Sequence, residues 1–540
     1  MGTRFFHRVA AAAAFAIASI GSAGAHQDDS AQGARKDYGR VLFKTSCTAE
    51  GQKQFDRALA MLHSFYFPET VKAFNAIPEA DPKCAIAYWG IAISQRPNPL
   101  VGPWDAATLK RGLDAIEKGE ALNATPRERD WLAALKEFYK DYARVDQDTR
   151  TRNYEQAMQR LSQKYPSDVE AKVFHALALN EIFDHKSMAP LMKAIAILEP
   201  LDKKYPDHPG ITHYLIHSYD FAPIAKRGIP AANKYAKVAP SAPHALHMPS
   251  HIYSMVGMWD ESVASNLESI KIANEFAAKA KIDGLPAGVA HSYDFMQYAY
   301  LQLGQDAKAK ALVDENAAFK KVVGIVSAGS TARAAVPARY YLERQDWKGA
   351  AQLQPFGTPF PAAEAITHFA RALGAARSGD VGAALVDIDK LKDLRAGLVK
   401  VNQSYWAEQI EVQVLAAQAW AAQGAGDKPG ALKFMRAAAD LEDSTEKHVA
   451  MENRLYPMRE LLADVLLEQG DAASALSEYE KSMQNTPNRL RGFYGAARAA
   501  TVLGDAKKTV HYTRALAQLT RNAQSDRAEI REARLIASVR

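Results

Sequence analysis

Cysteine is scarce in this sequence, and long apolar segments are absent after its N-terminal region. Cys47 and Cys84 are the only cysteines among 540 residues. They form neither a CxxC nor a CxxCH motif, which excludes a thioredoxin-like redox centre and a c-type haem attachment site. After the N-terminal region, no apolar run reaches the roughly 18 residues that a membrane-spanning helix needs. We therefore expect no membrane span in the mature chain.

Charge of one sign is also lacking, as are the short motifs of several common enzymes. The chain has 67 basic and 61 acidic residues, and the two signs are mixed along it. A dedicated nucleic-acid binder would show a basic stripe, so we expect no nucleic-acid partner. No HExxH, GxSxG or P-loop motif occurs, which removes three familiar catalytic and phosphate-binding templates. The sequence therefore assigns no reaction to the protein.

The N-terminus has the pattern of an export signal. Residues 1–25 combine the basic Arg4 and Arg8, an apolar run and the small residues Ala23 and Ala25 of a cleavage site, as a secretory signal peptide does. The alternative is a membrane anchor, but the run is short for a spanning helix. Residues 26–40 are polar and are expected to form a flexible leader. We expect an exported protein, located in the periplasm of a bacterium.

Export also bears on the two cysteines. In an oxidising compartment, a disulfide between Cys47 and Cys84 is the favoured interpretation. It would close a loop of about 36 residues and contribute about 3–4 kcal/mol in the loop-entropy model. The alternative is a pair of unbonded, buried thiols.

Residues 41–540 have the pattern of an all-α repeat protein. Apolar residues recur at spacings of three and four, and no convincing strand is found. Gly470 and Gly504 lie 34 residues apart, and the first is followed by a small residue, an aromatic residue, a small residue and a proline: Ala475, Tyr479, Ser482 and Pro487. This order resembles the tetratricopeptide repeat, a helix–turn–helix unit of 34 residues. Weaker copies turn at Gly257, Gly304 and Gly379.

The resemblance implies a TPR-like α-solenoid. Each helix pair buries its apolar face against its neighbours, and the stacked pairs form a right-handed superhelix with a concave groove. Such arrays commonly bind peptides in the groove. A peptide or protein ligand is therefore one expected partner.

Histidines cluster in one part of this array, residues 205–300. Their spacing of three and four places them on single helical faces. The candidate ligands are His213, His217 and Asp220 on one helix, His244, His247 and His251 on the next, and His291 and Asp294 on a third. Counted back from the glycine turns, with helices starting at Pro209, Pro243 and Ala290, these positions face the groove. Three successive inner helices would then aim imidazoles and carboxylates at one place.

Such a cluster predicts a transition metal site. Packed helices lie about 8–10 Å apart, so rings from neighbouring helices can meet at one ion, with zinc–nitrogen bonds of about 2.0–2.1 Å. We expect zinc, copper or iron, and one or two ions per chain, because eight ligands exceed one ion's need. The alternative is a polar groove without metal that receives a peptide or a small anion. Pro249 bears on the register, because it should kink the central helix or mark its start.

A wider resemblance covers nearly the whole mature chain. CAIAYWGIAIS (84–94), HYLIHSYD (213–220) and APHALHMPSHIYSMVGMWDESVASN (242–266) resemble a family of exported bacterial tetratricopeptide-repeat proteins with an HxxHMPSHI motif. The resemblance implies the fold and the position of the site, and supplies no reaction. His63 is a further candidate for the groove, whereas Glu446 and His448 are expected in an exposed loop.

Overall fold

The structure is a computed structural model that describes residues 37–67, 69–324 and 326–538. The helices before the histidine-rich region are α2 (Ala49–His63), α3 (Glu69–Ala80), α4 (Ile86–Ile93), α5 (Ala106–Glu120), α6 (Pro126–Tyr139), α7 (Gln147–Lys164), α8 (Val169–Glu181) and α9 (Ala189–Lys204). The histidine-rich region contains α10 (Pro209–Tyr219), α11 (Ile229–Val238), α12 (Pro243–His247), α13 (Pro249–Val256), α14 (Trp259–Lys279) and α15 (Ala287–Gln302). The predicted signal peptide lies outside the described residues.

The C-terminal half continues in the same way. Its helices are α16 (Asp306–Ala318), α17 (Val326–Glu343), α18 (Trp347–Ala351), α19 (Pro361–Arg377), α20 (Val381–Lys400), α21 (Ser404–Gly424), α22 (Lys428–Asp443), α23 (Met458–Glu468), α24 (Ala472–Asn485), α25 (Leu490–Val502), α26 (Ala506–Leu519) and α27 (Ala528–Ser538). Short 3-10 helices lie at Pro99–Val101 and Ala225–Gly228. Two short strands that the sequence did not predict, β1 (Leu285–Pro286) and β2 (Val322–Val323), pair in parallel.

The repeat pattern has a local physical basis at its glycine–aspartate pairs. Gly470 and Gly504 have φ angles of +93° and +71°, a left-handed conformation that glycine adopts without steric cost. The side chain of the next residue then caps the following helix: Asp471 accepts from the N–H of Ser474, and Asp505 from that of Lys508. Such caps satisfy donors that a helix start leaves unpaired. The other predicted turn glycines also have positive φ angles: Gly257, Gly304 and Gly379.

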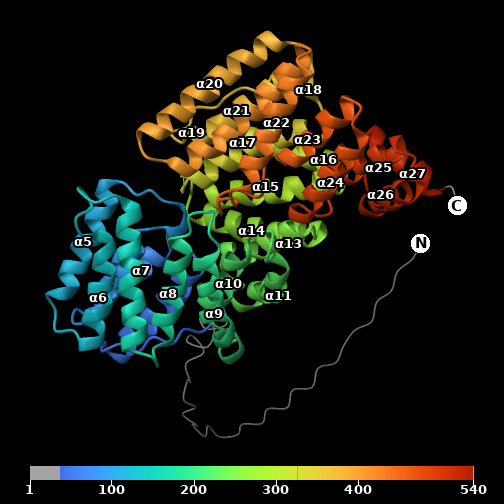
Figure 1. The fold of residues 1–540 in the computed structure, drawn as a ribbon. Helices are drawn as coiled ribbons and strands as arrows, with labels where there is room; N and C mark the ends of the chain where they lie inside the picture. Colours follow the sequence, from blue (N-terminus) through green and yellow to red (C-terminus); the bar gives the residue numbers. More distant parts are fainter. Residues whose placement is uncertain (1–36, 68, 325, 539–540) are drawn as a thin grey trace, which may run out of the picture.

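Successive helix pairs stack into a TPR-like α-solenoid, which confirms the predicted fold class (Figure 1). One buried core runs from Tyr38 to Tyr253, and a second from Ala334 to Tyr512. The histidine-bearing helices lie between the N-terminal helices and the C-terminal ones (Figure 1). The chain also curls back on itself, so that residues far apart in the sequence meet. The indole N–H of Trp259 donates to the carbonyl of Asn488 at 2.8 Å. The C-terminal repeats are thereby held against the region that carries the histidines.

The N-terminal end of the described chain is anchored in two ways. Tyr38 is buried, and the N–H of Arg40 donates to the carbonyl of Asp207 at 3.0 Å. The packed chain thus begins a few residues before the expected boundary at 41. The predicted disulfide joins Cys47 to Cys84, with Cα atoms 4.7 Å apart, a separation that suits a disulfide.

None of the helices in the described part of the chain is both long and apolar enough to cross a membrane.

Candidate metal centre

The predicted candidates lie on α10, α12, α13 and α15. Helix α10 begins at Pro209 and α12 at Pro243, as the repeat register predicts, whereas α15 begins at Ala287, three residues before the expected start. Pro249 opens α13, and Met248 before it has helical angles, with φ −52° and ψ −35°. The proline therefore marks the start of a second helix that directly continues the first.

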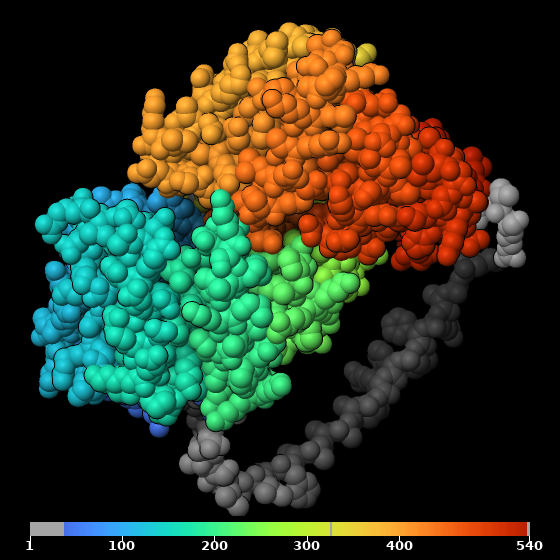
Figure 2. Space-filling model, viewed as in Figure 1, coloured from blue at the N-terminus to red at the C-terminus, as the bar shows by residue number. Residues whose placement is uncertain are grey.

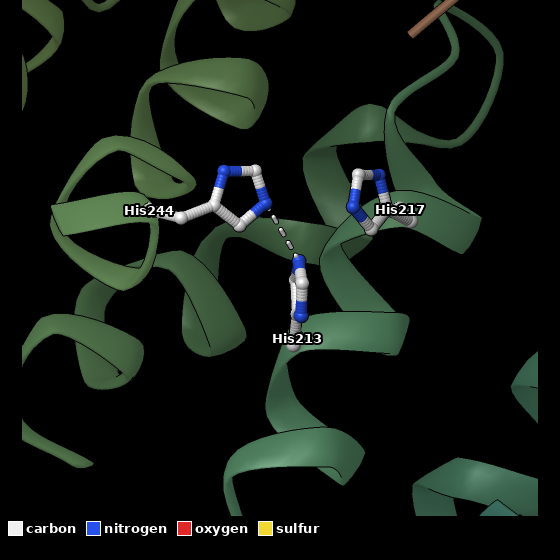
Figure 3. Close-up of side chains that lie close together, drawn as sticks. All are labelled: His213, His217 and His244. Carbon is white, nitrogen blue, oxygen red and sulfur yellow. Dashed lines mark hydrogen bonds between the residues drawn. The ribbon is translucent and has the colours of Figure 1, made fainter. Parts of the chain in front are cut away.

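Two helices supply a first group of three histidines (Figure 3). His213 and His217 come from α10 and His244 points toward them from α12, with one ring nitrogen of each within 4.8 Å of the others. His213 Nδ1 lies 2.6 Å from the carbonyl oxygen of His63. A carbonyl only accepts, so Nδ1 carries the proton and Nε2 keeps its lone pair. That Nε2 lies 3.1 Å from His244 Nε2.

His217 is the most exceptional member of this first triad. The residue is 2% exposed, and neither ring nitrogen has a hydrogen-bond partner in the described structure. A buried imidazole that has lost its hydrogen bonds to water, and gained none, costs free energy. A bound ligand would remove that cost.

A second triad follows directly. His247 from α12, His251 from α13 and His291 from α15 each offer a nitrogen within 4.8 Å of the other two. The Nε2 atoms of His247 and His251 are 3.1 Å apart. Ring centroids of His217 and His251 are 5.9 Å apart, and those of His244 and His247 are 6.0 Å apart. The six rings therefore form one continuous array.

Hydrogen bonds behind the second triad fix the protons on two of its rings. His247 Nδ1 lies 2.7 Å from Asn266 Oδ1. The Asn266 amide cannot be turned round, because its Nδ2 donates to the carbonyl of Ser262 at 2.8 Å. His251 Nδ1 lies 2.7 Å from Asp220 Oδ2. Both Nδ1 atoms must therefore donate, and both Nε2 atoms carry lone pairs. Two lone pairs that face each other at 3.1 Å are not a hydrogen bond.

The two predicted carboxylates lie beside the triads rather than within them. Asp220 Oδ2 accepts from His251 and from the Nζ of Lys447, which is 2.6 Å away. Asp294 pairs with the buried guanidinium of Arg339. Among the described residues, neither carboxylate belongs to a group of converging metal-ligating atoms. Asp220 instead orients a ring, as carboxylates behind metal-ligating histidines do.

Burial sets the charge state of the array. It lowers the pKa of His247 to about 4, and neighbouring imidazoles add to burial in holding five other values well below the usual range: those of His213, His217, His244, His251 and His291. Burial also raises the pKa of Asp220 to about 6, although Lys447 opposes this. At neutral pH the imidazoles are therefore uncharged and Asp220 is ionised.

Each triad has an aromatic wall. The ring of Phe65 lies 4.5 Å from that of His213 and 5.5 Å from that of His244, between centroids. Phe295 contacts the second triad in the same way, with centroids 4.6–5.0 Å from all three rings: His247, His251 and His291. These walls lower the local polarity, which strengthens any electrostatic interaction inside.

A third cluster was not predicted from the sequence. Glu170 accepts from the N–H of Leu42 at 2.7 Å and lies 2.9 Å from His63 Nε2 and 3.0 Å from His208 Nε2. His63 Nδ1 also lies 2.9 Å from the hydroxyl of Tyr214. The sequence candidate His63 thus lies behind the first triad, in a network of its own. His63 and Glu170 are 107 residues apart, and no local spacing connects them.

The segment between α22 and α23 also differs from its prediction. Glu446 and His448 are partly buried rather than exposed. The N–H of Glu446 donates to the carbonyl of His185 at 2.7 Å, and the ring of His448 lies 5.1 Å from that of His185. This packing carries Lys447 inward to Asp220. The long sequence separation hid this contact from the sequence analysis.

Comparisons with known proteins assign neither a family nor a function to the chain. No protein-family model matches the sequence, and no curated protein matches it. Among solved structures, the chain is similar to the human IFIT1 dimer with m7Gppp-AAAA (10% identity, TM-score 0.34, 94% of this chain and 97% of that one). It is also similar to a chain of the APC/C hetero-tetramer Cut9-Hcn1 (10%, 0.27, 88% and 95%) and to one of Naa15/Naa10 bound to HypK-THB (13%, 0.24, 89% and 90%).

Proposed function

We propose that this protein is a metalloprotein that binds a transition metal ion in each histidine triad. One observation carries the proposal: the Nε2 lone pairs of His247 and His251 face each other at 3.1 Å. Two metal–nitrogen bonds of about 2.05 Å place their nitrogens about 2.9 Å apart at 90° and about 3.3 Å apart at the tetrahedral angle. The observed separation lies between these values. A cation between the two rings would turn their repulsion into coordination.

The composition of each triad supports a site with chemistry. Three histidines leave an open position on a four-coordinate ion, as in catalytic zinc sites. Zinc, copper or iron bound there would supply a Lewis acid or a redox centre. The chain's own part is to hold the rings: Asn266 orients His247 and Asp220 orients His251. In this proposal neither carboxylate binds the ion: Asp220 orients His251, and Asp294 balances the charge of Arg339.

Export to the periplasm belongs to the same proposal. The Cys47–Cys84 disulfide supports it, because disulfides persist in oxidising compartments. The signal-peptide pattern of residues 1–25 supports it independently. Mass spectrometry of the protein from the periplasmic fraction should give a mature N-terminus at His26, and a chain that retains residues 1–25 would contradict it.

Metal analysis of the purified protein tests the central claim. We expect about two equivalents of zinc, copper or iron per chain. Changing both His247 and His251 to alanine should remove about one equivalent. His511→Ala is the matched control, because His511 lies on α26 outside every metal-ligating group among the described residues, and it should leave the metal content unchanged. A protein that takes up none of the three metals after stripping and reloading would overturn the proposal.

A second candidate function, a scaffold that binds a peptide or another protein, is favoured by the fold itself. TPR-like arrays present extended concave surfaces, and the described chain contains a cleft of about 350 Å³ between its two halves. In that case the histidines would be a buried polar network without metal. Stripped protein that keeps its fold and binds peptides as well as loaded protein does would favour this candidate.

A further inference from the structure

A cleft of about 350 Å³ has one member of the first triad, His217, among its lining residues. Its lining includes residues from α7 and α8 on one side, residues 402–406 and 448–449 on the other, and His217. It lies where the N-terminal and C-terminal parts meet (Figure 2). The volume falls within the range of small-molecule sites. Because His217 is buried and both its ring nitrogens are unpaired, it is the group that a ligand in this cleft would approach.

The charges of the cleft have one sign. Asp148, Glu181 and Asp184 line it, and no lysine or arginine occurs among its described lining residues. Asp148 and Asp184 are exposed. The Glu181 side chain is 2% exposed, and although Arg96 pairs with its Oε2 at 2.7 Å, Oε1 has no partner in the described structure. The cleft therefore has an excess of hydrogen-bond acceptors and negative charge.

Aromatic side chains form much of the remaining wall. Five aromatic residues line the cleft: Phe138, Phe183, Phe221, Tyr405 and Trp406. Aromatic faces attract organic cations, and the effect grows where water is excluded. His185 adds an acceptor, because its Nδ1 donates to the carbonyl of Lys447 at 3.1 Å and leaves Nε2 with its lone pair. Acidic groups and aromatic faces together select a ligand with a positive donor group and an apolar body.

We infer that this cleft binds a small organic amine. The ammonium group lies near Asp148 and Asp184, where carboxylates are exposed, and the apolar body extends along the aromatic wall toward His217. Only the approach of its apolar end to a metal ion in the first triad rests on the proposed function. The selection of an amine by the cleft does not.

Two ligands of the same shape and opposite charge test this inference. We would titrate phenethylamine and 3-phenylpropanoate into the full-length mature protein by calorimetry, in metal-loaded and metal-stripped forms. Phenethylamine should bind at least 10-fold more tightly than 3-phenylpropanoate. The double change Asp148→Asn and Asp184→Asn should weaken phenethylamine binding by about 10-fold. Asp283→Asn with Asp389→Asn, two exposed acids outside the cleft, is the matched control and should change nothing.

The outcomes separate the two proposals. Equal affinity for both ligands, or an unchanged affinity in the double variant, overturns the amine site even when the protein holds two metal ions. Selective binding of phenethylamine by a protein that takes up no metal supports the amine site and overturns the proposed metal function. In cobalt-loaded protein, phenethylamine should shift the visible absorption spectrum, and binding without any shift would show that the amine does not reach the first triad.

Discussion

The His63–Glu170–His208 cluster and the His247–His251–His291 triad are both buried, and they use their ring nitrogens in opposite ways. In the first, Glu170 accepts from both rings and from a backbone N–H. His208 Nδ1 accepts from the N–H of Ile211 at 3.3 Å, and His63 Nδ1 meets the Tyr214 hydroxyl. Every ring nitrogen of that cluster has a partner. In the triad, the outward-facing nitrogens of His247 and His251 are satisfied and their inward-facing ones meet each other.

The difference shows what distinguishes a structural cluster of histidines from a binding site. Burial is common to both, and so is close approach of the rings. The two clusters differ in their numbers of hydrogen-bond donors and acceptors. Around Glu170 each acceptor that faces a ring has a donor, whereas the triad has more acceptor lone pairs than donors. A surplus of buried lone pairs costs free energy, and a cation that joins them would remove that cost.

The largest expected effect tests the balanced cluster. Glu170→Ala should lower the free energy of unfolding by about 5 kcal/mol, because it removes the partner of two buried rings and of the Leu42 N–H together. Glu170→Gln is the matched control. Its amide oxygen can replace Oε1, and its NH₂ can donate to His63 Nε2 if His63 moves its proton to Nδ1 and donates to the Tyr214 hydroxyl. Urea unfolding measures both variants, and a cost for glutamine equal to that for alanine would contradict the tautomer argument.

Metal removal should have the next largest effect, and only the triads should respond. At a free metal concentration of about 1,000 times Kd, binding to the native state stabilises it by about 4 kcal/mol. Chelation should therefore lower the unfolding midpoint of the wild type and of Glu170→Gln alike. Chelation should lower the unfolding midpoint of the His247→Ala, His251→Ala double variant by less, because only the first triad of that variant can bind metal. Equal losses in the wild type and in the double variant would place the ion elsewhere.

A third test compares Glu170 with a buried carboxylate whose surroundings shift its pKa in the opposite direction. Contacts with His208 and His63 outweigh burial and lower the pKa of Glu170, whereas burial raises that of Glu442 to about 7. With a value of about 4.5 when unfolded, native Glu442 binds a proton between pH 4.5 and 7 that the unfolded chain releases. Its contribution is therefore present below pH 4.5 and is lost as pH rises through 7, by about 3 kcal/mol in total.

Glu442→Gln should remove this pH dependence. Its amide oxygen can still accept from the N–H of Met458, which now donates to Glu442 Oε2 at 2.8 Å. We would measure the free energy of unfolding of both proteins from pH 4.5 to 8. As pH rises, the value for the variant should increase relative to that for the wild type. A constant difference would show that Glu442 has an ordinary pKa.

The sequence predicted those parts of the molecule that depend on local spacing. The turns at Gly470 and Gly504 and the starts of α10 and α12 follow from repeat register. The convergence of six histidines follows from their spacing of three and four on successive helices, although the register of α15 was wrong by three residues. It missed Glu170, Lys447 and Asn266, because their contacts with the histidine network join segments that no short motif relates. Lys447 reaches Asp220 across 227 residues. It also grouped Asp220 and Asp294 with the ligands, because helical spacing gives the face of a residue and not the group that its oxygen atoms meet.

The smallest expected effect concerns a residue that sequence reasoning could not find. Asn266→Leu removes the acceptor that fixes the proton of His247 on Nδ1, so Nε2 is free to take the proton and oppose a metal ion. Loss of such an orienting contact typically weakens metal binding by about 10–100-fold. Asn266→Asp loses the hydrogen bond to the Ser262 carbonyl but keeps an acceptor oxygen facing His247 Nδ1, so it should hold its metal about as tightly as the wild type. Competition with a chromophoric chelator measures both affinities. Asn266 is not itself a proposed metal ligand, so it acts only through the proton of His247. An unchanged metal affinity in the leucine variant would therefore show that the lone pairs of His247 and His251 do not hold the ion. The contrast with the Glu170 cluster would then lose its chemical basis.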